Sequence, residues 1–165
     1  MSVHIEAMRP ADWGEVAEVY GEGITTGNAT FEAEVPSWAQ WETSHLEGCR
    51  LVAREGGVLL GWAALSPVSR RACYGGVAEV SVYVREAARG RGVGRALLDH
   101  LVEASEAAGI WTLQGSTFPE NAASLRLQAA CGFRVVGRRE RIAQLHGRWR
   151  DTVLTERRSS KVGAE

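Results

Sequence analysis

The sequence predicts an α/β (α+β) fold, in which helices pack on a mixed sheet. Several short stretches alternate apolar and polar residues, as strands with one buried face do. Between them lie runs with apolar residues at helical spacing. The resulting order is one strand, two helices, three strands, a helix, a strand, a helix and two strands, which is typical of a sheet covered by helices.

The N-terminal part is predicted to contain one strand and two helices. The segment "VHIEAM" (residues 3–8) alternates apolar and polar residues, which indicates a strand. Asp12 is the expected N-cap of a helix in which apolar residues recur at helical spacing, namely Trp13, Val16, Ala17 and Tyr20. The stretch "TTGNATFEAE" breaks this pattern and is expected to be a loop. "PSWAQWETSHLEG" starts with proline and ends with glycine, as a short helix often does.

The middle of the chain is predicted to contain three strands and a helix. The strands "RLVARE" and "VLLGWAALSP" flank Gly56-Gly57, which favours a hairpin. "SRRACYGG" is expected to be the next turn, followed by a strand over residues 77–84. A glycine-rich loop then leads to a helix from about residue 92 to residue 108, with Val93, Leu97 and Leu101 on one side.

The last part is predicted to contain a strand, a helix and a final pair of strands. Residues 110–116 form the strand, and "PENAASLRLQAACGF" forms a helix that Gly132 ends. "FRVVGRRERI" and "RWRDTVLTER" are the expected pair. Since 165 residues suffice for one core, we expect one domain over residues 1–156 and a flexible polar tail over residues 157–165.

The composition excludes several classes of mechanism. Because the net charge is −1, no overall field attracts nucleic acid or a membrane surface. Lys161 is the only lysine, which excludes a Schiff base or a phosphate-binding lysine in the core. The three cysteines are scattered and form no CxxC pair, so we expect neither a disulfide framework nor a metal site. Free thiols suggest a reducing compartment.

The expected location follows from two further features. The first ten residues lack a basic segment followed by an apolar stretch, so we expect no secretory signal. The most apolar window, residues 56–65, has about half the roughly 20 residues that a membrane-spanning helix requires. We therefore expect a cytoplasmic protein without nucleic-acid or membrane partners.

The glycine-rich loop "YVREAARGRGVGRALLDHL" is the strongest candidate for a binding site. A strand that enters a helix through such a turn exposes backbone N–H groups at the helix N-terminus, where they and the helix dipole favour an anion. Gly90, Gly92 and Gly94 leave room for a diphosphate, and arginines add positive charge at positions 89, 91 and 95. The alternative is a tight turn with a solvated arginine cluster.

Two well-known phosphate loops do not fit this segment. The Walker type needs GxxxxGK[ST], and the segment has no lysine. The dinucleotide type needs GxGxxG, and its third glycine position is occupied by Arg95. It also needs an acidic residue at the end of the next strand, where the chain reads "LQGS".

A third pattern does fit. Arg89-x-x-Gly92-x-Gly94 resembles the acetyl-CoA pyrophosphate loop of the GNAT acetyltransferase superfamily. "NAASLRLQAACGF" resembles the second signature of that superfamily, with Asn121 and Ser124 at its start. The resemblance implies a mixed, mostly antiparallel central sheet with helices on both faces, and acetyl-CoA as the cosubstrate. The residues it implies for binding acetyl-CoA are Val82, Tyr83, Val84, Arg89, Gly90, Arg91, Gly92, Val93, Gly94, Arg95, Asn121 and Ser124.

Three longer stretches resemble the phosphinothricin N-acetyltransferase family. They are "TTGNATFEAEVPSWAQW", "SPVSRRACYGGVAEVSVYV" and "LHGRWRDTVL". This resemblance implies acetylation of the α-amino group of phosphinothricin, methionine sulfoximine or methionine sulfone, and a homodimer. It also implies substrate contacts by Phe31, Arg71 and Tyr74, a base at Glu79 and a site histidine at His146.

The chemistry independently requires a base. An amine attacks a thioester only as the free base, and amino groups are mostly protonated near neutral pH, so a nearby group must take the proton. Glu79 lies in the strand that leads to the glycine-rich loop, and it points to the same side as Ser81 and Tyr83. The alternative is that these residues form an ordinary solvated sheet face.

Other roles stay open at this point. His146, beside a glycine near a turn, can equally be a surface residue. Arg70 adjoins Arg71 and could hold an acidic substrate instead. Many superfamily members have a tyrosine that protonates the departing thiolate where this chain has Gln128, so a water could serve or no dedicated acid is needed.

Two other functions compete with acetylation of an amino acid. One is acetylation of a different small amine or of a protein N-terminus. A polyamine site is usually acidic, and the Arg70/Arg71 pair argues against one. The other is a non-catalytic acyl-CoA-binding protein, against which the presence of Glu79 weighs.

Overall fold

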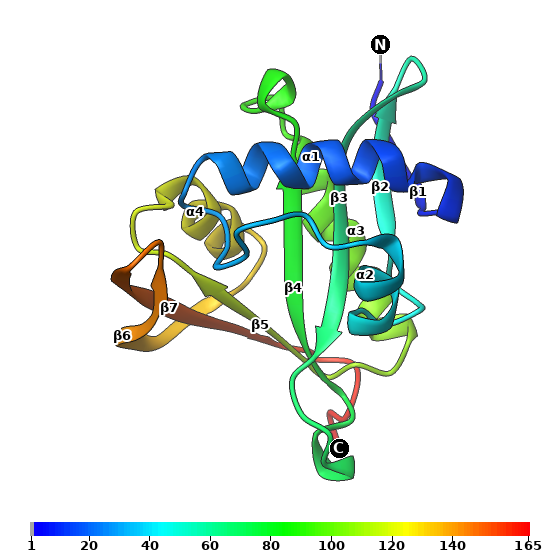
Figure 1. The fold of residues 1–165 in the computed structure, drawn as a ribbon. Coiled ribbons are helices and arrows are strands. Elements are labelled where there is room, and N and C mark those ends of the chain that lie inside the picture. The colour runs from blue at the N-terminus through cyan, green and yellow to red at the C-terminus, as the bar shows by residue number, and fades with distance from the viewer. Residues whose placement is uncertain (1) are drawn as a thin grey trace.

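The computed structural model describes residues 2–165, and seven strands form one twisted sheet in it (Figure 1). The strand order is β1-β2-β3-β4-β5-β7-β6, and every neighbouring pair is antiparallel except β4 and β5. The strands are β1 (His4–Ala7), β2 (Leu51–Glu55), β3 (Val58–Pro67), β4 (Val77–Val84), β5 (Thr112–Thr117), β6 (Arg134–Leu145) and β7 (Arg148–Arg158).

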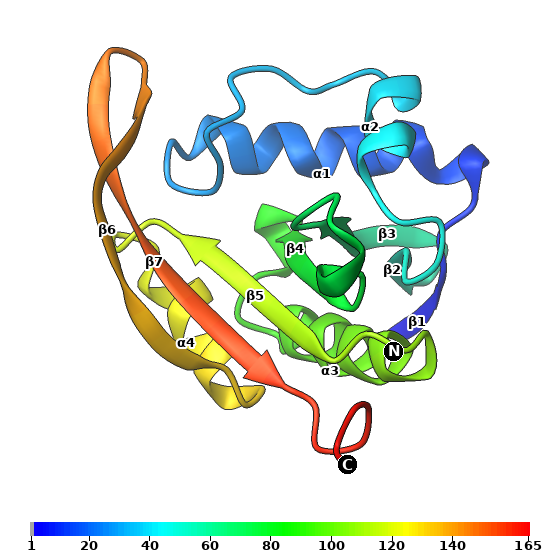
Figure 2. The same cartoon turned by 90° about the horizontal axis from the view of Figure 1, so that it is seen from below.

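Helices cover both faces of the sheet, as Figure 2 shows from below. One face carries α1 (Trp13–Thr25) and α2 (Trp38–Ser44), and the other carries α3 (Val93–Ala107) and α4 (Ala122–Ala130). The predicted mixed, mostly antiparallel sheet with helices on both faces is therefore confirmed. Among residues 2–165, no helix is both long and apolar enough to cross a membrane.

Two boundaries differ from the sequence prediction. The strand expected from residue 110 begins at Thr112, because the Ile110 N–H bonds back to Ser105 and closes the end of α3. β6 continues to Leu145, well past the expected end of its segment, because it pairs with β7 as far as Leu145 and Arg148. Irregular pairing between Arg139 and Ala143 bends this long hairpin.

Each face of the sheet has its own core. On the α1/α2 face, Trp41 and Trp62 are buried with their ring centroids 5.6 Å apart, and Trp38 stacks on Trp41 at 5.8 Å. On the α3 face, leucines of the helix pack on alternate valines of β4. Trp38 and Trp41 therefore have a packing role in this core.

The last residues of the chain contact the body of the molecule. The guanidinium of Arg158 donates to the backbone oxygens of Val162 and Gly163 at 2.8 and 2.7 Å. The Ser159 hydroxyl is buried and donates to Glu106 of α3. The Ser159 bond attaches the start of the 157–165 segment to α3, and the Arg158 bonds hold residues 162 and 163 against the end of β7.

The feature that positions the site is the short contact between β4 and β5. These parallel strands pair only from Val77–Thr112 to Glu79–Gln114. Beyond that point they diverge, and in the described chain residues 80–84 pair with β3 alone. The predicted alternation along β4 is confirmed, since Val80, Val82 and Val84 pack against the α3 core while Tyr83 packs on the α1 side.

Candidate active site

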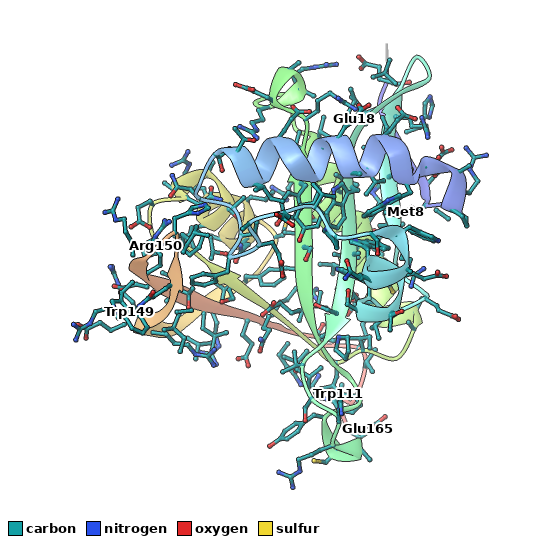
Figure 3. The ribbon with its side chains drawn as sticks, in the orientation of Figure 1. Met8, Glu18, Trp111, Trp149, Arg150 and Glu165 are labelled. Carbon is teal, nitrogen blue, oxygen red and sulfur yellow. The ribbon has the colours of Figure 1, made fainter. Side chains whose placement is uncertain are left out.

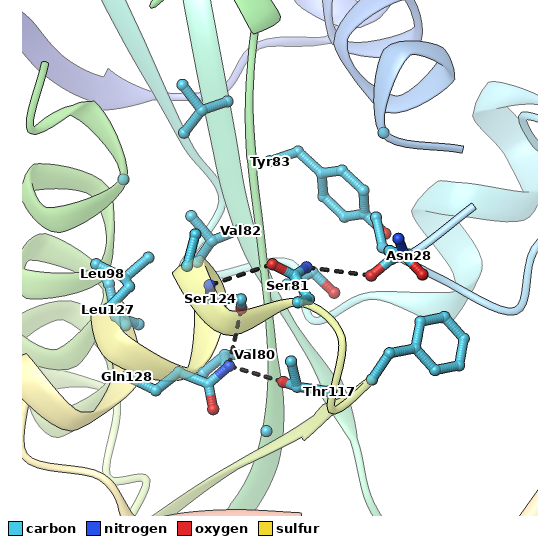
Figure 4. Close-up of a pocket in the computed structure, with 18 of the residues that line it drawn as sticks. Asn28, Val80, Ser81, Val82, Tyr83, Leu98, Thr117, Ser124, Leu127 and Gln128 are labelled. Atoms are coloured by element: carbon cyan, nitrogen blue, oxygen red, sulfur yellow. Dashed lines mark hydrogen bonds between the residues drawn. The ribbon is translucent and has the colours of Figure 1, made fainter. Parts of the chain in front are cut away.

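A cleft of about 810 Å³ opens where β4 and β5 separate (Figure 4). β4 forms one wall, and the end of β5 with the start of α4 forms the other. The glycine-rich loop before α3 closes one end, and the loop after α1 contributes Asn28, Ala29, Thr30 and Phe31. The cleft therefore joins the two segments that the sequence motifs single out.

The glycine-rich loop has the conformation that an anion site requires. Gly90 and Gly92 have φ angles of 77° and 81°, in the left-handed region that favours glycine, and Gly92 is the N-cap of α3. The backbone N–H groups of residues 90–95 donate to no acceptor within the described chain. A side chain at Gly94 would lie 3.2 Å from Leu127. Open donors of this kind at a helix N-terminus fit an anion such as a diphosphate.

The arginines of the loop differ in what they contact. Arg91 binds Glu55 at 2.7 Å, outside the cleft, and this hydrogen bond lowers the pKa of the Glu55 carboxyl. Arg95 lines the cleft and pairs with Asp99 at 3.0 Å. Arg89 also lines it, and its Nε lies 3.4 Å from the Val84 carbonyl oxygen. Arg89 and Arg95 are therefore the arginines of this loop that line the cleft beside the open backbone amides.

Glu79 lines the cleft at the point where β4 and β5 part. It is half-buried, and its Oε1 accepts a hydrogen bond from Gln114 Nε2 at 3.0 Å. Val84 is five positions farther along this extended strand, which corresponds to about 17 Å. One face of the cleft thus leads from a carboxylate along β4 to the anion-binding loop.

The start of α4 forms the opposite wall. Asn121 is the N-cap, and its Oδ1 accepts from the Ser124 N–H at 3.2 Å. Its Nδ2 donates to the Asn28 carbonyl oxygen at 3.1 Å, so the same side chain ties α4 to the loop after α1. Gln128 follows one helical turn after Ser124 and is buried at the inner end of the cleft.

Aromatic side chains line the cleft beside the loop after α1. Phe31 meets Phe118 edge to face at 4.8 Å, and the guanidinium of Arg150 lies 4.0 Å over the Phe118 ring. Arg150 also donates to the Gly27 carbonyl oxygen at 2.9 Å, and Figure 3 shows it pointing in from the β6–β7 hairpin. These contacts hold the loop after α1 over the cleft.

Tyr83 also lines the cleft. Burial raises the pKa of its hydroxyl group, so the hydroxyl stays neutral.

Four of the predicted site residues lie outside the cleft, and three of them are in exposed turns. Arg71 and Tyr74 belong to the exposed turn around the short 3₁₀ helix η2 (Ala72–Tyr74), with the guanidinium 5.6 Å from the ring. His146 is exposed in the turn between β6 and β7, where its φ is 51°. Within residues 2–165 none of the three lines the cleft, and neither does Arg91. The predicted residues that do line it are Phe31, Glu79, Val82, Tyr83, Val84, Arg89, Gly90, Gly92, Val93, Gly94, Arg95, Asn121 and Ser124.

Sequence reasoning missed several cleft residues. Thr117, at the end of β5, and Phe118, directly after it, come from a segment that carries no motif of its own. A signal exists at Gly115, because a side chain there would lie 2.6 Å from the Gln128 amide oxygen. A glycine inside a strand often marks such a close approach, but its partner in space cannot be read from the sequence.

A family model and several relatives match the chain. The model described as Acetyltransferase (GNAT) family matches residues 16–133. A phosphinothricin N-acetyltransferase of Alcaligenes faecalis is 34% identical over 164 residues, covering 93% of this chain and 81% of that protein. The L-methionine sulfoximine/L-methionine sulfone acetyltransferase of Pseudomonas aeruginosa is 31% identical over 163 residues and covers 94% of both chains.

A solved structure agrees with these matches. The GNAT superfamily phosphinothricin acetyltransferase from Sinorhizobium meliloti, in complex with AcCoA, superposes with a TM-score of 0.88 at 29% identity. The superposition covers 100% of this chain and 92% of the other. The chain therefore belongs to the acetyltransferase (GNAT) family, in its phosphinothricin N-acetyltransferase-like branch, and it is an acyltransferase.

Proposed function

We propose that the protein transfers the acetyl group of acetyl-CoA to the α-amino group of a small amino-acid-like acceptor, of the phosphinothricin or methionine sulfoximine and sulfone type. The observation that carries this proposal is one cleft that combines the open amides of residues 90–95 with the carboxylate of Glu79. Relatives named for phosphinothricin and for methionine sulfoximine and sulfone, similar over most of the chain, support the acceptor class.

Residues of the chain can hold the cosubstrate along the whole cleft. The amides of residues 90–95 would bind the diphosphate, with Arg89 and Arg95 beside it. Residues 82–84 lie on the cleft side where β4 has lost its partner, so their backbone is available to an extended amide-containing arm. Asn121 and Ser124 face it from α4. Acetyl-CoA supplies the activated acetyl group.

In this proposal Glu79 takes the proton of the acceptor amine. Its carboxylate has one oxygen engaged by Gln114 and lone pairs left for an ammonium group or a bridging water. Transfer is direct, within one complex of both substrates, because the cleft-lining residues include no cysteine that could carry the acyl group. Phe31 would pack against the acceptor from the loop after α1.

The residues proposed to bind the acid group of the acceptor can reach the cleft only from a second chain or by movement of an exposed loop. Arg71, or Arg70 beside it, and Tyr74 lie on an exposed turn outside the cleft of their own chain. His146 is exposed in the hairpin turn. A homodimer that brings such exposed residues of one chain to the cleft of the other is part of the proposal. Exposed apolar side chains on β6 and β7 support it, namely Val135, Val136, Ile142 and Trp149.

The decisive experiment is a thiol-release assay with purified protein, acetyl-CoA and a panel of acceptors. The panel contains phosphinothricin, methionine sulfoximine, methionine sulfone, a polyamine and a peptide with a free N-terminus. We expect turnover with the first three and little with the last two. Turnover with the peptide or polyamine alone would assign a different acceptor. CoA binding without turnover on any amine would indicate an acyl-CoA-binding protein.

A further inference from the structure

A buried amide joins three hydroxyl groups at the inner end of the cleft. Gln128 Nε2 donates to Thr117 Oγ1 at 2.8 Å and to Ser124 Oγ at 3.1 Å, as the dashed lines in Figure 4 show. Its Oε1 accepts from Thr155 Oγ1 at 2.5 Å. Gln128 and Thr117 are only 5% and 8% exposed. A side chain on Gly115 would collide with the amide, so the strand makes room for it.

The hydrogen bonds favour one orientation of this amide. As described, both N–H groups of Gln128 have a hydroxyl acceptor and its oxygen has a hydroxyl donor. In the reversed orientation the NH₂ group would face Thr155 Oγ1, which is the one side-chain partner of Gln128 Oε1 within residues 2–165. The Thr155 hydroxyl could accept from one N–H of the amide, and the other buried N–H would have no acceptor. A buried unsatisfied donor costs free energy, so the first orientation is favoured.

This orientation determines which way the hydroxyl protons can point. Thr117 Oγ1 and Ser124 Oγ each use a lone pair to accept from Gln128, so the proton of each hydroxyl points elsewhere. Neither hydroxyl donates to an acceptor in the part of the chain that the structure describes. Both residues line the cleft. The pair is therefore a donor site for an atom of a bound molecule.

We propose that Gln128 is a positioning residue that directs the hydroxyl protons of Thr117 and Ser124 toward the thioester sulfur during acetyl transfer. The inference rests on the proposed function. In that reaction the acceptor nitrogen forms a bond to the acetyl carbon, and Glu79 takes a proton from that nitrogen. The carbon–sulfur bond breaks with its electron pair left on sulfur. Two aligned O–H donors stabilise this developing anion without giving up their protons.

The proposal explains how the chain functions without an acid at this position. Gln128 stands where many superfamily members have a tyrosine, and an amide has no proton to give at neutral pH. A thiolate is a stable leaving group compared with an alkoxide, since thiols have pKa values near 8.5. Hydrogen bonds from Thr117 and Ser124 therefore suffice, and solvent protonates the released thiolate after transfer.

The test measures the ionisation of the thiol of bound CoA as a function of pH, from the ultraviolet absorbance of the thiolate. We expect the ionisation constant of the bound thiol to fall about tenfold in Gln128→Met, since a charge-assisted hydrogen bond is worth about that factor. In Gln128→Glu the fall should be larger, because a carboxylate turns both hydroxyl protons toward itself. The matched control is Gln144→Glu on the exposed surface of β6, which should match the wild type. A parallel loss of kcat with unchanged KM for acetyl-CoA is expected in both Gln128 variants.

A second comparison separates orientation of the hydroxyls from other effects. In the Thr117→Val/Ser124→Ala background, Gln128→Met should cause no further change, because the groups it positions are gone. An equal effect of Gln128→Met in both backgrounds, or no effect in the wild-type background, would overturn the proposal. Single Thr117→Val and Ser124→Ala variants keep the amide, so they test the donors even if a Gln128 variant fails to fold.

The outcomes also distinguish this proposal from the proposed function. If wild-type protein binds CoA and acetylates an amine but the bound thiol ionises alike in all variants, only the role of Gln128 is lost. If wild-type protein binds no CoA, the proposed function itself is contradicted.

Discussion

Glu79 can take part in chemistry because of its position, at the point where β4 stops pairing with β5. In a fully paired part of the sheet its side chain would have side chains of both neighbouring strands beside it. Glu79 instead belongs to the last β4–β5 pair, and its side chain borders the cleft. One oxygen accepts from Gln114, which leaves lone pairs for a substrate amine. The same side chain can therefore be both structurally anchored and chemically available.

Replacing this carboxylate tests its role. Glu79→Gln keeps the size and a hydrogen bond to Gln114 but removes the base, so we expect kcat to fall by about 100-fold or more. The pH–rate profile should shift to higher pH, because only amine that has already lost its proton can then react, while calorimetry should give an unchanged affinity for CoA. Glu34→Gln, on the exposed loop after α1, is the matched control. An unchanged pH–rate profile for Glu79→Gln would remove this residue from the mechanism.

A second carboxylate, Asp12, has a structural effect. It is 2% exposed and accepts from Arg54 at 2.6 Å and from the Arg9 N–H at 2.8 Å. Burial acts to raise the pKa of Asp12, but the bonds from Arg9 and Arg54 outweigh it and the pKa is lowered. Because the folded-state pKa is depressed, Asp12 stabilises the fold above its unfolded pKa, near 3.9, and this contribution is lost as the pH falls through the folded value.

Two substitutions measure that contribution. Asp12→Ala should lower the free energy of unfolding in urea at pH 7 by about 2 kcal/mol, less than the 3–5 kcal/mol for an isolated buried pair, because Arg54 keeps Glu6 and Glu15. Asp12→Asn should flatten the dependence of that free energy on pH below about 4. An unchanged pH dependence would mean that other acids dominate.

At the scale of elements, the proposed binding of a diphosphate depends on the conformation at the start of α3. Gly92 combines a left-handed φ of 81° with open space beyond its Cα, so its amide and those that follow are accessible from the cleft. Gly57, in the turn between β2 and β3, has a similar φ of 84° and similar open space but lies outside the cleft. The two glycines form a matched pair.

Alanine substitutions separate strain from binding. Gly92→Ala and Gly57→Ala should each destabilise the fold by roughly 1 kcal/mol, since both force an L-residue into the left-handed region. Only Gly92→Ala should also weaken CoA binding, by about tenfold or more, because its methyl group occupies space that the diphosphate needs. Equal CoA affinities of the two variants in calorimetry would speak against diphosphate binding at this loop.

The elements also explain what the sequence could predict. Strand β4, helix α3 and the N-cap Asn121 follow from local patterns, because alternation, glycine and capping residues act within a few positions. The Gln128 network could not be predicted, since Thr117, Thr155 and Gly115 come from strands that only the folded sheet brings together. The length of β6 was missed because its pairing with β7, and not its composition, extends it.

At the scale of the whole molecule, exposed apolar surface gathers on the β6–β7 hairpin. Trp149 and Val135 are 58% and 64% exposed, and Figure 3 shows Trp149 at the outer side of this hairpin. Exposed aromatic surface of this kind is typical of protein interfaces. His146 lies in the same hairpin, so its proposed role depends on a second chain.

Sedimentation tests the homodimer directly. We expect a dimer for the wild-type protein and a monomer for Trp149→Arg, because a buried arginine without a partner disrupts an apolar interface. Val58→Arg, a half-exposed site on the β2–β3 hairpin, should remain a dimer. A wild-type monomer at assay concentrations would rule out the second chain, so Arg71, Tyr74 and His146 could then reach the cleft only by movement of their exposed turns.

The central claim concerns the whole cleft and its anion-binding end, and calorimetric titration tests it most directly. CoA and pantetheine share the sulfur-containing arm, but pantetheine lacks the diphosphate that the amides of residues 90–95 would bind. We predict saturable heat with CoA and none with pantetheine at the same concentrations. Equal heats from both compounds, or no heat from CoA, would contradict the account.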